Sequence, residues 1–296
     1  MPGSLLRSIV KRSLPRLRRY GGRPIFCVPG DHIGDSIFID GLYEGALLQT
    51  AFSTLLAGYA QQFAACACLD VGANIGNHSV FFADRFARVI AVEPNPIFCM
   101  ALRATIALNG LSNVELIECG LGSESGRFAY RQASAANLGA SQFIAAARNC
   151  ATAKDCPQLE IRIGDAVVES LDIARLGLIK IDVEGLELAV LEGLKLTLSK
   201  HDPVVMFEAH PEVDRAGAEA TLKLLRTLGF VHLYSCERPR MPRHASKFKR
   251  AIFRLRNGSR PRPVRVEVLD DRQYLMLFAS RRPLMQDALH GARDWP

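Results

Sequence analysis

The feature that most restricts the fold of this chain is a regular alternation of short apolar runs with longer amphipathic stretches from residue 47 onward. Nearly continuous apolar strands alternating with helices are typical of a parallel sheet covered on both faces. The sequence predicts an α/β fold with a doubly wound, mostly parallel seven-stranded sheet. The expected strands are residues 67–71, 89–92, 114–118, 178–183, 204–208, 230–235 and 274–279, and the clearest helices are 77–85, 97–109, 187–198 and 216–228. No helix precedes the last strand, which we expect to be antiparallel.

The composition and the distribution of charged residues divide the chain into a core and several appended segments. The 296 residues are 49% hydrophobic and 23% charged, a globular composition that excludes disorder over the whole chain. We expect a basic N-terminal segment at 1–30, a core at 31–237, a basic insertion or lid at 238–265, and the last strand with a tail at 266–296. Within the core, an excursion at 120–177 contains residues 126–131 and 158–163, which we expect to pair as an added hairpin.

The basic side chains are concentrated in the two appendages. Residues 1–30 hold seven basic side chains and residues 238–265 hold eleven, without any acid. Since the net charge of the whole chain is +7, the remaining residues carry a net charge of −11. Such segments favour an anionic partner, and the alternation of leucine and arginine in residues 1–20 favours the surface of an anionic membrane. An acid-free, arginine-rich start also fits a mitochondrial transit peptide, which is the lesser alternative to a cytoplasmic, peripherally bound protein.

Cysteine and apolar patterns bear on class and location. Eight cysteines are scattered without paired zinc spacing, which favours reduced thiols in the cytoplasm and no metal site. The longest apolar runs, at 54–60 and 63–69, are far shorter than the ~18 residues that a membrane-spanning helix needs. Aromatic side chains are scarce in the second basic segment, which argues against nucleic acid as a partner because single-stranded bases stack on aromatic rings.

A glycine loop between the first strand and its helix predicts a ligand site. The sequence Asp70-Val71-Gly72-Ala73-Asn74-Ile75-Gly76 allows a close backbone approach and exposes the N–H groups at a helix start. Glu93 ends the next strand, 21 residues after Gly72, where an acid can accept both hydroxyls of a ribose. Glu118 ends the third strand in the same way and is a candidate for the adenine edge.

A ladder of charges on the fourth strand is the second signal. In Ile179-Lys180-Ile181-Asp182-Val183-Glu184-Gly185 the period of two places Lys180, Asp182 and Glu184 on one face of the strand. Unpaired buried charges cost several kcal/mol. The ladder therefore indicates either an internal ion pair of Lys180 or a strand that enters a crevice.

These motifs together resemble the FkbM-type S-adenosylmethionine-dependent methyltransferases. The resemblance rests on residues 70–76, 92–95, 171–172, 179–185 and 190–193, and weaker echoes occur at 41–44, 137–141 and 203–208. It implies a Rossmann-like class I methyltransferase fold and S-adenosylmethionine as the cofactor. The candidate binding residues for this cofactor are Asp70, Gly72, Asn74, Gly76 and Glu93, together with Glu118 from its place at a strand end. The resemblance also implies transfer of a methyl group, usually to a hydroxyl of a glycan, glycolipid or secondary metabolite.

A hydroxyl acceptor needs a base, because an alcohol is a poor nucleophile. Asp182 and Glu184 lead as base or substrate anchor, since ligands bind at the carboxyl ends of strands in this architecture. Lys180 is expected to orient these acids or to lower a hydroxyl pKa, and His210 to line the same crevice; His78 and Glu208 are further candidates. An RNA methyltransferase and a non-catalytic module of the same fold that docks on anionic membrane are the alternatives.

Overall fold

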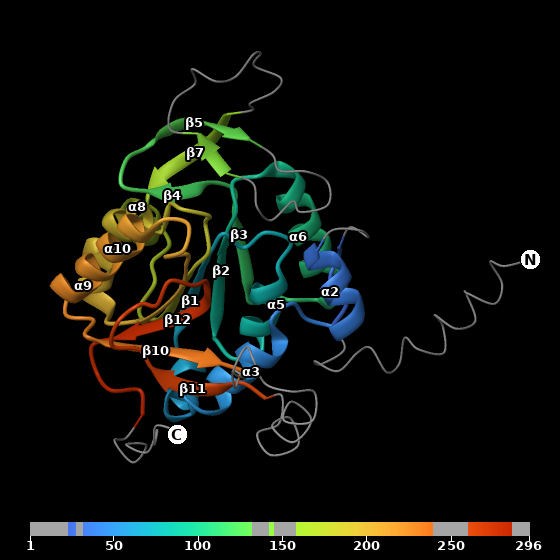
Figure 1. Cartoon of the computed structure of the whole chain (residues 1–296). Coiled ribbons are helices and arrows are strands. Elements are labelled where there is room, and N and C mark those ends of the chain that lie inside the picture. Colours follow the sequence, from blue (N-terminus) through green and yellow to red (C-terminus); the bar gives the residue numbers. More distant parts are fainter. Residues whose placement is uncertain (1–22, 28–31, 132–141, 145–157, 239–259, 286–296) are drawn as a thin grey trace, which may run out of the picture.

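The computed structural model describes residues 23–27, 32–131, 142–144, 158–238 and 260–285, which form two sheets. The larger sheet has eight strands in the order β11-β10-β12-β9-β8-β1-β2-β3 (Figure 1). Along the chain these are β1 Ala67–Val71, β2 Arg88–Val92, β3 Val114–Ile117, β8 Leu176–Ile181, β9 Val204–Ala209, β10 His232–Glu237, β11 Arg262–Arg265 and β12 Tyr274–Ser280. The predicted membrane-binding segment at 1–20 lies outside the described residues.

Strand direction confirms the predicted mostly parallel sheet and corrects its strand count. The neighbours β3, β2, β1, β8 and β9 pair in parallel, while β12 pairs antiparallel with both β9 and β10. The eighth strand, β11, pairs antiparallel with β10 at the sheet edge. The expected basic insertion at 238–265 includes these four residues because the whole segment is basic, and three of the four are exposed.

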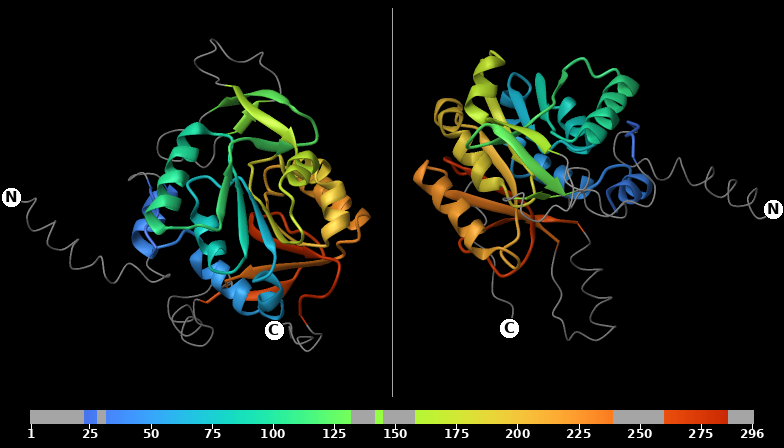
Figure 2. Two further views of the ribbon diagram at one scale, coloured as in Figure 1. Left: turned by 180° about the vertical axis from the view of Figure 1, so that it is seen from behind. Right: turned by 90° about the horizontal axis from the view of Figure 1, so that it is seen from above.

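Helices cover both faces of the larger sheet (Figures 1 and 2). On one side lie α3 (Gly45–Ser53), α4 (Ala60–Phe63), α5 (Asn77–Ala83) and α6 (Pro96–Asn109), preceded by α2 (His32–Asp40) and a 3-10 turn at Ala57–Tyr59. On the other lie α7 (Gly164–Ser170), α8 (Glu187–Gly193), α9 (Lys195–His201) and α10 (Arg215–Thr227). The strand period of two separates the cores: Ile179 and Ile181 pack with α8 and α10, whereas Leu178 packs with α3 and α5. None of the described helices is long and apolar enough to cross a membrane.

The helix predicted at 187–198 is two helices, because a second sheet packs against the chain where it bends. A Cβ on Gly193 would lie 1.9 Å from the carbonyl oxygen of Gly122. Backbone therefore meets backbone at this point, and α8 ends at Gly193 before α9 begins at Lys195. The continuous apolar pattern concealed this break.

The second sheet is formed by the excursion between β3 and β8. Its order is β4-β7-β5-β6, with β4 Gly120–Gly122, β5 Gly126–Arg131, β6 Gln142–Ile144 and β7 Gln158–Ile163. Strands β5 and β7 pair antiparallel, as predicted for the added hairpin. The sheet lies beyond the ends of β1–β3 in Figure 1 and brings Tyr130 of β5 to the cleft described below.

Candidate active site

A cleft of about 970 Å³ opens at the carboxyl ends of the parallel strands. Ligands bind at this edge in doubly wound sheets, since the loops that follow neighbouring strands diverge there. The core strands contribute Gly72, Asn74, Glu93, Asp182, Glu184 and Glu208 to its lining. The predicted cofactor loop and the predicted catalytic acids thus share one cavity.

The glycine loop is held in a conformation that only glycine accommodates at its tightest point. Gly72 has φ +76°, and a Cβ there would lie 1.9 Å from the carbonyl oxygen of Asp182. Its N–H donates to the Val92 carbonyl at 3.0 Å, so the loop bridges the ends of β8 and β2. Asn74 is also left-handed, with φ 51°. Gly76 lies behind the cleft wall, where a Cβ would meet Leu102 at 2.3 Å.

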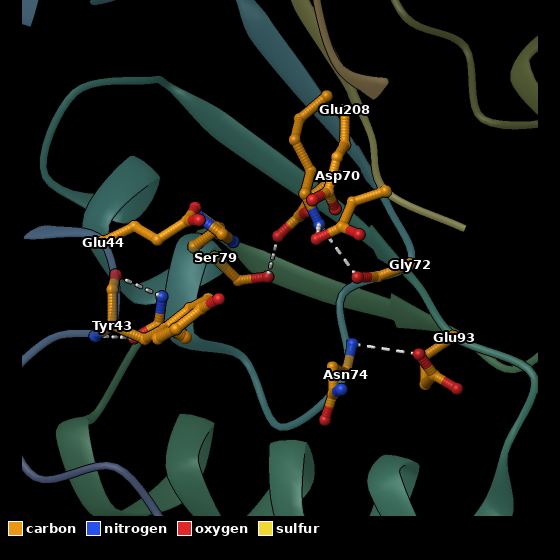
Figure 3. A network of polar contacts seen from close by, with 12 residues as sticks. Tyr43, Glu44, Asp70, Gly72, Asn74, Ser79, Glu93 and Glu208 are labelled. Carbon is orange, nitrogen blue, oxygen red and sulfur yellow. Dashed lines mark hydrogen bonds and ion pairs between the residues drawn. The ribbon is translucent and has the colours of Figure 1, made fainter. Parts of the chain in front are cut away.

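Glu93 joins the loops that follow β1 and β2. Its Oε2 accepts the N–H of Asn74 at 2.9 Å (Figure 3). Its Oε1 accepts the N–H of Asn95 at 2.8 Å. Burial raises the pKa of the Glu93 carboxyl to about 7, although both N–H groups and Lys180 oppose the shift. Each oxygen keeps a further acceptor position, and the side chain lines the cleft.

Lys180 forms an internal ion pair, which was one of the two interpretations of the charged residues on the fourth predicted strand. It is 2% exposed, and its Nζ lies 3.2 Å from Asp70 Oδ1 and 3.3 Å from Asp182 Oδ2 while donating to the Gly72 carbonyl at 2.9 Å. Ser79 Oγ donates to Asp70 Oδ2 at 2.6 Å (Figure 3). Lys180 and Asp70 do not line the cleft. Lys180 contacts the Gly72 carbonyl and Asp182, and Asp70 pairs with Lys180, so the two residues support the glycine loop and Asp182.

Three carboxyl groups gather in the cleft with different proton affinities. Burial raises the pKa of Asp182, but Lys180 outweighs it and keeps that pKa below its ordinary value. Burial and the charges of Glu208 and Asp182 raise the pKa of Glu184 to about 7. Burial also raises the pKa of Glu208, which accepts one hydrogen bond from Gln273 at 2.8 Å and shares another with Asp182. Such separated affinities suit acid–base chemistry near neutral pH.

Two predicted residues lie away from the cleft lining. Glu118 is half-exposed and pairs with Arg103 at 2.7 Å. His210 lies behind Glu208, with 2.9 Å between Nε2 and Oε1, and this contact raises the pKa of His210 to about 9. An imidazole held charged in this way cannot accept a proton at neutral pH.

Part of the cleft lining comes from outside the core motifs and was not predicted from the sequence. The cleft is also lined by Tyr43 and Glu44 from the loop before α3, and by Glu237, Arg238, Arg272 and Gln273 from the region of β10 and β12. The weak echo at residues 41–44 was the available signal for the first pair. The second group reaches the cleft because of the strand order, in which β12 lies between β9 and β10.

The donor set fits a nucleoside that carries an amino acid. Gly72 and Asn74 offer backbone at close range, Glu93 offers acceptors for a diol, and the surrounding carboxylates suit a cationic group such as a sulfonium. Among the described residues no group of three or more His, Cys, Asp or Glu side chains is placed to hold a metal ion.

Comparison with known proteins decides the family. Residues 70–234, more than half of the chain, match the family model described as the methyltransferase FkbM domain. The chain belongs to the FkbM methyltransferase family. The predicted S-adenosylmethionine-dependent methyltransferase is thereby confirmed, with S-adenosylmethionine as its cofactor.

Similar proteins share this region at moderate identity. Methyltransferase 1 of Beauveria bassiana is 28% identical over 188 residues, which cover 58% of this chain and 74% of the relative. The hexuronic acid methyltransferase AglP of Haloferax volcanii is 32% identical over 145 residues, covering 49% of this chain and 56% of AglP. This chain therefore spans little more than half the length of AglP. The crystal structure of methyltransferase FkbM from Methylobacillus flagellatus aligns with 92% of this chain and 60% of its own, at 15% identity and a TM-score of 0.43.

Proposed function

We propose that this protein is an O-methyltransferase that acts on a sugar hydroxyl, with Glu184 as the base. The observation that carries the proposal is the group of Asp182, Glu184 and Glu208, which line the cleft beside the glycine loop. Hydroxyl acceptors need proton removal, and this group supplies an acceptor in the right pH range.

The proposed step assigns a different role to each carboxyl group. S-adenosylmethionine supplies an electrophilic methyl group on a sulfonium that leaves as a neutral thioether. The acceptor oxygen forms the new C–O bond as the C–S bond breaks, and its proton passes to the Glu184 carboxylate. Asp182 stays ionised beside Lys180, and Glu208 is paired with the His210 imidazolium behind it. Much of the rate comes from holding the two reactants in line.

The charge of the described lining favours an uncharged acceptor. Seven acids line the cleft, Asp40, Glu44, Glu93, Asp182, Glu184, Glu208 and Glu237, against the two arginines Arg238 and Arg272. A neutral hydroxyl compound meets less repulsion there than a phosphate or carboxylate does. The name of the AglP relative, a hexuronic acid methyltransferase, supports a sugar as the acceptor but not an uncharged one, since a hexuronic acid carries a carboxylate. The anionic acceptor expected from the basic segments depends largely on residues 239–259, outside the described chain.

Transfer of tritiated methyl groups from S-adenosylmethionine to methyl β-D-glucopyranoside and methyl β-D-glucuronide tests the proposal. We expect the wild type to methylate a hydroxyl of the neutral sugar and Glu184→Gln to lose ~10²–10⁴-fold in turnover, the typical contribution of a general base. Glu192→Gln is the control, since Glu192 is exposed and pairs with Lys195. Equal turnover by Glu184→Gln and wild type would exclude Glu184 as the base, and absence of transfer to any sugar would exclude the substrate class.

Membrane contact through 1–20 and 238–265, and with it a peripheral cytoplasmic location, remains a prediction. Sedimentation with anionic and neutral liposomes across a salt series tests it, because electrostatic docking weakens steeply as ionic strength rises.

A further inference from the structure

The loop before α3 is fixed to the first turn of α5, which begins directly after the glycine loop. Asn77 holds Tyr43 by two hydrogen bonds: Asn77 Oδ1 accepts the Tyr43 N–H at 2.9 Å, and Asn77 Nδ2 donates to the Tyr43 carbonyl at 3.0 Å. Asn77 is 5% exposed. Tyr43 and Glu44 therefore keep a fixed position relative to the cofactor loop, and both line the cleft.

Glu44 reaches the cleft from a strained backbone position. Its φ is 57°, a left-handed conformation that side chains other than glycine rarely adopt, and such residues concentrate at binding sites. Its Oε2 lies 3.5 Å from Nε2 of His78, and both side chains are more than nine-tenths buried. His78 Nε2 makes no hydrogen bond within the part of the chain that the structure describes. The Glu44 carboxylate thus lines the cleft with spare acceptor capacity, and the His78 imidazole lies behind it.

Tyr43 presents a donor to the same space. Its hydroxyl makes no hydrogen bond to any described residue, and its side chain extends towards the strand end that carries Asp70 and Gly72 (Figure 3). Burial raises the pKa of the phenol, and the charges of Glu44, Glu208, Asp182 and Glu184 raise it further. The phenol therefore keeps its proton and remains a hydrogen-bond donor among acceptors.

We propose that Tyr43 and Glu44 bind the acceptor, the phenol donating to an oxygen next to the reacting hydroxyl and the Glu44 carboxylate accepting from a hydroxyl, with His78 positioning Glu44. Consecutive residues that offer one donor and one acceptor match a compound with neighbouring oxygens, such as the vicinal diol of a sugar ring. The inference rests on the proposed function and narrows it: a simple alcohol with one hydroxyl would leave Tyr43 or Glu44 unpaired.

Steady-state kinetics with methyl β-D-glucopyranoside tests the two binding residues. We expect Tyr43→Phe to raise the acceptor KM about 5–10-fold and Glu44→Gln about 10–100-fold, as for a lost neutral and a lost charge-assisted hydrogen bond. The affinity for S-adenosylhomocysteine, measured by calorimetry, should stay within about twofold. Tyr59→Phe is the matched control, since Tyr59 packs against Phe63 away from the cleft. Unchanged acceptor KM in both cleft variants would overturn the proposal, as would an equal loss of S-adenosylhomocysteine affinity.

A deoxy analogue separates direct contact from indirect effects. Mass spectrometry locates the methylated hydroxyl, and the glucoside lacking the adjacent hydroxyl is then assayed. The acceptor KM of the wild type should rise on this analogue about as much as the KM of Tyr43→Phe or Glu44→Gln rises on the full sugar. The variant whose contact the analogue lacks should show no further rise in KM on the analogue, because the same contact is then removed from both sides. Additive losses would refute the contact. If the wild type methylates no sugar, the proposed function fails and this inference fails with it, whereas wild-type turnover with unaffected variants refutes this inference alone.

The role of His78 is tested by rescue. His78→Gln keeps an N–H donor that can face Glu44, whereas His78→Leu removes it. We expect the leucine variant to raise the acceptor KM as Glu44→Gln does and the glutamine variant to restore it. Equal KM values in the two variants would show that His78 acts through packing alone.

Discussion

Removing the Lys180 side chain should destabilise the whole domain, which makes Lys180→Met the sharpest test of the site's architecture. Lys180 is 2% exposed, and its Nζ contacts two carboxylates at 3.2 and 3.3 Å and a carbonyl at 2.9 Å. Methionine preserves the volume but leaves Asp70, which is 0% exposed, without its counter-ion. Breaking a buried pair in this way costs about 3–5 kcal/mol.

That loss is a large part of the ~5–15 kcal/mol that stabilises a typical domain. At ~2–4 °C per kcal/mol for a protein of this size, the Tm should fall by about 6–20 °C. Urea denaturation followed by circular dichroism measures the change directly. The control is Lys195→Met, because Lys195 is half-exposed and lies 3.9 Å from its partner Glu192. Exposed pairs of this kind contribute about 0–1 kcal/mol.

Two outcomes bear on the reasoning. If Lys180→Met loses less than about 1 kcal/mol, the buried ion pair is not what holds the strand ends together. If the loss is as large as expected, Lys180→Met combined with Asp70→Asn should recover part of it, since the second change removes the unpaired charge.

The remaining predictions concern the cofactor, the base and the packing of the second sheet. Glu93→Ala should weaken binding of S-adenosylhomocysteine by ~1.5–3 kcal/mol in calorimetry, and an unchanged affinity would remove Glu93 from the site. Because the pKa of Glu184 is raised to about 7, turnover should rise with pH up to about 7 and then level off, and this limb should vanish in Glu184→Gln; persistence of the limb would assign it to another group. Gly193→Ala should lower the free energy of unfolding by ~1–3 kcal/mol through the clash with Gly122, whereas Gly58→Ala, where a Cβ meets nothing within 4 Å, should not; equal stabilities would contradict the close contact.

The core of the fold could be predicted because its signals are local and strong. The first strand has the bounds expected from its apolar run, and β2, β8 and β9 deviate by a few residues at their ends. β11 could not be predicted in the same way. Its four residues pair antiparallel with β10, and nothing in Arg-Pro-Val-Arg marks a buried face.

The residues of the candidate site were likewise predictable only where the signal in the sequence is local. Gly72, Asn74, Glu93, Asp182 and Glu184 were identified because they follow strands directly, where topology places ligands. Glu118 occupies an equivalent sequence position, yet its charge is satisfied by Arg103. Which of two acids after a strand faces the cleft depends on partners from other elements, and a single sequence does not show them.

Glu93 also affects how the free protein prepares for its ligand. The Glu93 carboxylate accepts hydrogen bonds from the N–H groups of two different loops, so it orders both loops before a ligand binds. The entropy of ordering these loops is then spent during folding instead of on association. We therefore expect the Glu93→Ala variant to show a less favourable binding entropy in addition to the loss of its hydrogen bonds to the ligand, together with faster amide hydrogen exchange at residues 72–76 and 94–96 in the unliganded state.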